Sequence, residues 1–97
     1  MDQISKYVDL RQDDFISVLS EIVSIPSVSG DATYRKHVFT MANWLSNKMT
    51  SLNIELKQHL PGTQTIQGQT IDLPPILLGR YGSDPLKKTV LVYGILI

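Results

Sequence analysis

Cysteine is absent from this chain of 97 residues, and its absence excludes several kinds of site. Without thiols the chain has no disulfide framework, no cysteine-based zinc cluster and no thiol nucleophile. A chain without disulfides is typical of proteins in a reducing compartment, and we therefore expect a cytoplasmic location.

An excess of charge and a long apolar segment are absent as well. Nine Lys and Arg balance nine Asp and Glu, and no run of one sign is longer than a pair such as Asp13-Asp14 or Lys87-Lys88. This balance indicates neither a nucleic acid nor an anionic membrane as a partner. The first residues are polar and acidic, so the sequence predicts no secretory signal. No apolar run is long enough to predict a transmembrane segment.

What is present is typical of a globular protein. Apolar residues make up 42% of the chain and charged residues 19%, a mixture that is unlike that of disordered segments. A chain of this length is near the lower end of the range for a single domain. We therefore expect one core at most, within a single unit spanning residues 1–97.

Helical spacing predicts a first helix from about Asp13 to the residues before Pro26. Its apolar positions recur every three or four residues, and they are Phe15, Ile16, Leu19, Ile22 and Val23. The acidic residues at its start suit the positive end of the helix dipole. Pro26 disfavours helical geometry at the preceding residue, so residues 25–30 are interpreted as a loop.

A second helix is predicted to begin after a cap at Asp31 or Ser29 and to end at Asn53. One apolar face runs along its whole length. The residues on that face are Tyr34, Val38, Met41, Ala42, Leu45, Met49 and Leu52. This face is expected to pack against the rest of the domain.

Strand signals follow the two helices. Residues 54–57 alternate apolar with polar side chains, which predicts a half-buried strand. Residues 63–72 are interpreted as a long surface connection that carries at most a short irregular strand. Residues 76–81 and 89–93 flank a segment rich in turn residues and predict a hairpin. Two helices and about three strands, a hairpin among them, indicate an α/β fold in layers.

The two histidines, His37 and His59, are the first candidates for a metal site. A hydrolytic zinc site needs at least three well-placed donors, and no ligand motif joins these two residues. We interpret both as ordinary surface or half-buried side chains. Ser27 and Ser29 lie on a loop where a nucleophile could be held, but no His and Asp are spaced to activate them. The sequence therefore predicts no catalytic, cofactor-binding or metal-binding residue.

Three weaker patterns have simpler structural interpretations. The start of a helix at residues 29–31 could bind an anion, but capping by Asp31 is the favoured interpretation. The glycines Gly62, Gly68, Gly79 and Gly82 do not form a phosphate-binding loop between a strand and a helix. Aromatic and methionine side chains could also line a cofactor-binding surface, and the candidates are Tyr34, Met41, Trp44 and Met49. Their spacing places most of them on the packed helix face, so packing is the favoured interpretation.

Three motifs together resemble a known family. They are IPSVSGD at residues 25–31, LPPILLGRYGSDP at residues 73–85 and KKTVLVYG at residues 87–94. In this order they are similar to the zinc-dependent cytosolic dipeptidases, which include the non-specific cytosolic dipeptidase, carnosinase and the Cys-Gly metallodipeptidases. The resemblance implies the N-terminal portion of a layered zinc-peptidase catalytic domain.

The resemblance also implies where the first metal-binding motif should lie. In that family the strand that matches residues 89–94 is followed by His-x-Asp, whose His binds zinc and whose Asp supports the metal-activated water. Here Ile95-Leu96-Ile97 stands in its place, and an aliphatic side chain can neither bind zinc nor act as an acid or base. Residues 1–97 are thus expected to form a partial domain that ends just before the first metal-binding motif and is inactive alone.

Two hypotheses follow for function. The first is a fragment that resembles a metallodipeptidase, whose intact relatives hydrolyse dipeptides such as Cys-Gly with zinc. The second is a small non-enzymatic interaction module that associates through exposed strands, with residues 90–97 as the adhesive element. Its expected partners are further copies of itself or a full-length relative.

Overall fold

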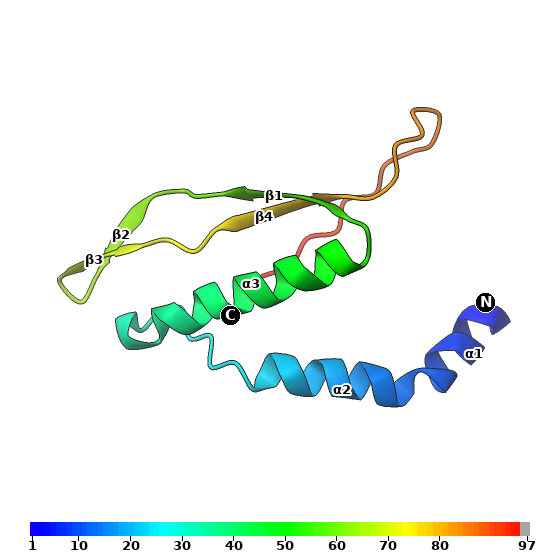
Figure 1. Cartoon of the computed structure of the whole chain (residues 1–97), viewed down its shortest axis with the longest axis horizontal. Helices are drawn as coiled ribbons and strands as arrows, with labels where there is room; N and C mark the ends of the chain where they lie inside the picture. The colour runs from blue at the N-terminus through cyan, green and yellow to red at the C-terminus, as the bar shows by residue number, and fades with distance from the viewer. Residues whose placement is uncertain (96–97) are drawn as a thin grey trace.

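The structure is a computed structural model that describes residues 1–95, and it confirms an α/β fold. Figure 1 shows a helical arm, a long helix and a narrow antiparallel ribbon on the other side of that helix. The helical elements are α1 (Asp2–Leu10), α2 (Gln12–Val23), the short 3₁₀ helix η1 (Ala32–Tyr34) and α3 (Arg35–Ser51). The strands are β1 (Glu55–His59), β2 (Thr63–Ile66), β3 (Gln69–Asp72) and β4 (Ile76–Arg80).

Helices α1 and α2 form an N-terminal arm. Helix α2 confirms the first predicted helix, whereas α1 was not predicted because its polar opening residues lack a long apolar pattern. The two helices meet at Arg11, and neither of them contains a buried residue. The rings of Tyr7 and Phe15 lie 6.5 Å apart across this junction. The arm therefore has local contacts but lacks a core of its own.

Helix α3 confirms the second predicted helix, and the predicted cap at Asp31 lies at the start of η1, which leads directly into α3. The Asp31 side chain accepts a hydrogen bond from the backbone N–H of Thr33 at 2.9 Å, as a capping residue does. The chain leaves the helix at Leu52 and then passes through the left-handed region at Asn53, whose φ is 61°. Asparagine tolerates this conformation better than most residues, so the predicted end at Asn53 is also explained.

Strand β4 pairs with β1, which corrects the predicted hairpin of residues 76–81 and 89–93. The two strands are antiparallel, with Leu56 opposite Gly79 and Gln58 opposite Leu77. Residues 89–93 form no strand. Their β-branched and aromatic side chains favour a strand, but a strand also needs a neighbouring strand whose backbone groups are free to pair with it. Strand β4 pairs with β1 in a two-stranded sheet, and no other described strand lies on its second edge.

The segment at residues 63–72 is a regular hairpin rather than a long surface connection. Strands β2 and β3 pair in antiparallel register from Thr63 opposite Asp72 to Ile66 opposite Gln69. The turn between them places Gln67 at φ 54° and Gly68 at φ 76°, and two positive φ angles match the twist of a two-residue hairpin. The polar composition hid this strand pair because neither of its faces is deeply buried.

The core is small and lies at the middle of α3, where the helix packs on β1 and β4. Val38, Met41 and Ala42 keep only 2–3% of their surface exposed, whereas Leu45 and Met49 are half-buried. The predicted ends of the face, Tyr34 and Leu52, are exposed. The radius of gyration, 16.7 Å, exceeds the roughly 12.5 Å of a compact domain of this length.

Candidate functional site

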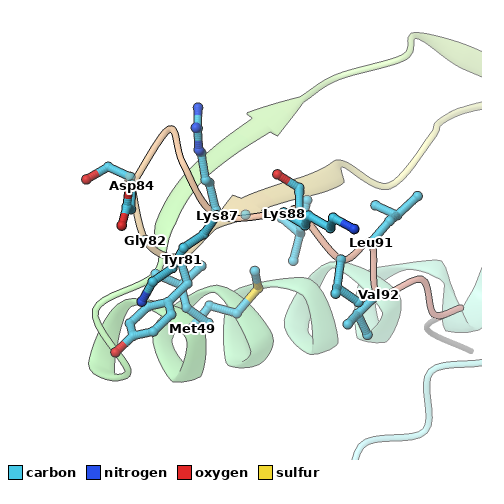
Figure 2. Close-up of a pocket in the computed structure, with 15 residues that line it drawn as sticks. Met49, Tyr81, Gly82, Asp84, Lys87, Lys88, Leu91 and Val92 are labelled. Atoms are coloured by element: carbon cyan, nitrogen blue, oxygen red, sulfur yellow. The ribbon is translucent and has the colours of Figure 1, made fainter.

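A groove lies between the C-terminal part of α3, strand β4 and the segment that follows it. Its volume is about 820 Å³, and Met49, Ile54, Leu77 and Gly79 line it on the side of the helix and sheet. The opposite side is formed by residues 80–84 and 87–92. Figure 2 shows Met49 rising from α3 below the segment that carries Lys88, Leu91 and Val92.

Gly79 brings the helix and the sheet together at this groove. A Cβ atom at position 79 would lie 2.4 Å from the Met49 Cε and 2.8 Å from the Ile54 Cγ2, both far below a normal contact distance. The position therefore needs glycine for close approach and not for its backbone conformation. Sequence reasoning did not assign this packing role to Gly79.

The side chains of the groove suit binding better than catalysis. Apolar side chains line it from both sides, and the charged groups among the lining residues are Arg80, Asp84, Lys87 and Lys88. Ser83 lies there too, but the described lining holds no histidine that could take its proton. The groove is thus an apolar surface with a mostly basic border.

The two histidines lie apart from this groove. His37 is half-buried on α3, with its ring 6.0 Å from that of Tyr34, and His59 is an exposed residue at the end of β1. Within residues 1–95, no three or more His, Cys, Asp or Glu side chains gather closely enough to hold a metal ion. These donors therefore do not fit a zinc site. Ile95 is exposed, and Leu96 and Ile97 lie outside the described residues.

The loop that carries Ser27 and Ser29 is held by a buried arginine. Arg35 is 6% exposed, and its Nη2 donates a hydrogen bond to the Ser29 carbonyl at 2.5 Å. Its Nη1 donates a longer bond of 3.4 Å to the Asp72 carbonyl, while its Nε is buried without a partner. The guanidinium thus joins the loop to the end of β3. Ser27 is buried beside Pro26, and the structure supports a packing role for this loop.

Sequence reasoning missed Arg35, although one signal was present. Arg35 lies three residues before Val38 and seven before Ala42, so helical spacing places it on the buried face of α3. A charged residue on an apolar face usually has a specific partner, because a buried charge without hydrogen bonds is costly. The partners are backbone carbonyls, which no side-chain motif reveals.

The four residues considered as a cofactor wall do not form one. Met41 is buried and Met49 faces Gly79, as expected for core residues. Trp44 instead donates its indole N–H to the Glu21 carboxylate at 3.0 Å, and the Lys48 ammonium lies 5.7 Å from its ring centroid. Trp44 therefore links α2 to α3, and the assignment of most of this set to the core was too broad.

Comparison with known proteins gives several matches. The chain is 43% identical over 94 residues to the Cys-Gly metallodipeptidase dug1 of Schizosaccharomyces pombe, which covers 97% of this chain and 20% of that protein. It is 33% identical over 97 residues to the Beta-Ala-His dipeptidase of Homo sapiens, covering 97% and 19% respectively. No protein-family model matches the chain.

Two solved structures share its backbone. The crystal structure of human carnosine dipeptidase 1 superimposes with a TM-score of 0.80 at 32% identity, covering 89% of this chain and 18% of that one. The dipeptidase Dug1p of Saccharomyces cerevisiae gives a TM-score of 0.79 at 33% identity, covering 86% and 18%. The chain therefore spans about a fifth of the length of the relatives it matches. Among the described helices, none combines the length and apolar character that a membrane crossing requires.

Proposed function

Because this chain is homologous to Cys-Gly metallodipeptidases and carnosine dipeptidases over about a fifth of their length, we propose that it forms the N-terminal portion of their layered catalytic domain. In this proposal residues 1–97 act as a scaffold for dipeptide hydrolysis and supply no metal ligand. The observation that carries it is the backbone match, with TM-scores of 0.80 and 0.79.

The donor chemistry supports the second half of the proposal. From the resemblance of residues 87–94 to the family we expect a zinc-binding His and a catalytic Asp in the relatives at the positions where this chain has Ile95 and Ile97. Isoleucine has no lone pair for a metal and no proton to exchange. Zinc and dipeptide are therefore assigned to the intact relatives, and residues 1–97 alone are proposed to be inactive.

Zinc binding and hydrolysis test this proposal on the purified chain. Isothermal titration with Zn²⁺ and an assay with Cys-Gly and β-Ala-His should show no stoichiometric binding and no turnover, with an intact relative as the positive control. The double variant Ile95→His/Ile97→Asp adds two donors and should bind Zn²⁺ measurably, without reaching the affinity of a complete site. Stoichiometric zinc retained by the unaltered chain, or hydrolysis above the blank, would contradict the proposal.

One observation favours the interaction module as a second candidate. Val90, Leu91 and Val92 keep 84–89% of their surface exposed, although such side chains are usually covered. A non-enzymatic chain could use them to associate with a partner. The nucleotide sequence after the codon for Ile97 distinguishes the two candidates, since a His-x-Asp continuation in any frame supports the dipeptidase scaffold.

A further inference from the structure

The hairpin of β2 and β3 is a separate element of the fold. In the described part of the chain these two strands pair only with each other, and none of their residues is deeply buried. Figure 1 shows the hairpin continuing beyond the β1–β4 pair, toward the end of the molecule at which α3 begins. A hairpin of two strands is at best marginally stable by itself. Its position therefore depends on the few groups that hold its base.

The base of the hairpin is built like a hinge. Gly62 precedes β2 at φ 115°, a conformation that residues with a Cβ atom rarely adopt. Pro74 and Pro75 follow β3, and their rings fix φ on that side. The Leu73 backbone N–H donates a hydrogen bond to the Gly62 carbonyl at 2.8 Å, so the two chain segments lie side by side where they enter the hairpin. Rotation about this base changes only a few backbone dihedral angles.

A pocket of about 320 Å³ separates this base from α3. Phe39 lines it on the side of the helix, and the residues on the side of the hairpin are Leu60, Gly62, Thr63, Asp72 and Leu73. Side chains that interdigitate leave no space of this size between them. The hairpin base is therefore not packed tightly on the helix, and a rotation of the hairpin breaks few contacts.

Arg35 holds the hairpin from a position one helical turn before Phe39. Within residues 1–95, the bond from its Nη1 to the Asp72 carbonyl is the one hydrogen bond that joins the hairpin to an element outside it. This bond is long, at 3.4 Å, whereas the bond from Nη2 to the Ser29 carbonyl is short, at 2.5 Å. The guanidinium is thus held firmly by the loop and weakly by the hairpin.

We infer that the β2–β3 hairpin is a flap that rotates about its base, and that Arg35 is the latch that holds it near α3. The latched position carries a cost, because the Arg35 Nε is buried without a partner. Rotation away from α3 admits water to the guanidinium, and hydration of Nε and Nη1 then offsets the lost bond to Asp72. The inference goes beyond dipeptide hydrolysis, since every group that it uses lies in residues 29–75.

Distances between spin labels test this motion on the full 97-residue chain, in which the absence of cysteine allows each label to be placed at a chosen site. The pair Asn47→Cys/Gln69→Cys measures the hairpin against α3, and Asn47→Cys/Lys57→Cys measures β1 against α3, all at exposed positions. Arg35→Met should make the first distance distribution at least about twice as broad and leave the second unchanged. Phe39→Ala widens the pocket without removing the latch and should broaden the first distribution less.

Arg11→Met is the matched control, because it removes an exposed guanidinium from the arm and should leave both distributions unchanged. A first distribution that Arg35→Met does not broaden overturns the proposal, since the hairpin is then held without the latch. Equal broadening of both distributions overturns it as well, because Arg35 then holds the helix on the sheet. If circular dichroism shows that Arg35→Met does not fold, the same outcomes are decided with Phe39→Ala.

Discussion

The middle of α3 and residues 90–92 are similarly apolar but differ completely in burial. Val38, Met41 and Ala42 keep 2–3% of their surface exposed, whereas Val90, Leu91 and Val92 keep 84–89%. The helix lies against the paired strands β1 and β4, while the later segment has no strand beside it in the described part of the chain. Hydrophobicity thus indicates which side chains favour burial, and only a neighbouring element with a matching surface covers them.

The largest effect should come from a charge in the packed region. Met41→Asp places a carboxylate where 2% of the side chain is exposed, and it should lower the free energy of unfolding by about 3 kcal/mol or more. For a chain with so small a core, this change is expected to abolish the cooperative transition. Circular dichroism during thermal unfolding measures it, and an unchanged midpoint would contradict the burial of α3.

Arg35 should give the next largest effect, because it joins two segments that are far apart in sequence. Arg35→Met keeps the length and apolar stem but removes the hydrogen bonds to the Ser29 and Asp72 carbonyls, at a cost of about 2 kcal/mol. Arg35→Lys keeps the charge without the planar fork and should recover only part of the loss. Urea unfolding with a constant slope measures both variants, and equal stability of Arg35→Lys and the unaltered chain would reject the two-point role.

The close contact at Gly79 should produce a smaller loss. Gly79→Ala forces its new methyl group against Met49 and Ile54, and overpacking of this kind costs about 1–2 kcal/mol. The far end of Met49 is flexible, so the same substitution should cost less in a Met49→Ala background. A double-mutant cycle in urea measures this coupling. Strict additivity would show that Gly79 and Met49 do not press on each other.

The smallest effect is expected in the exposed run. Leu91→Lys should change the stability of the monomer by less than about 0.5 kcal/mol, because Leu91 is already 89% exposed. The comparison must be made at a concentration at which the chain is monomeric, since Leu91 also lines the groove. Thermal unfolding of Leu91→Lys beside Met41→Asp then contrasts the two regions directly. A loss of 2 kcal/mol or more at Leu91 would mean that this segment is covered.

The cap at residue 31 was predictable from the sequence, but the groove was not. The capping role predicted for Asp31 is confirmed at the start of η1, whereas the absence of a metal at His37 and His59 stays a prediction from the sequence. The groove could not be predicted, because Met49 and Leu91 are brought to it from elements 42 residues apart in sequence. Contacts between distant segments depend on chain reversal, which local patterns do not specify.

The sequence by itself determined α2 and α3, the turn at Asn53 that follows α3 and the homology to dipeptidases, because helical periodicity, caps and motifs are local or directly readable. Tertiary structure alone decided that β4 pairs with β1, that residues 89–93 stay unpaired and that Arg35 is buried. The physical reason is the same in each case. A strand and a buried charge both require hydrogen-bonding partners, and the folded chain, not the local pattern, determines which groups are near enough to provide them.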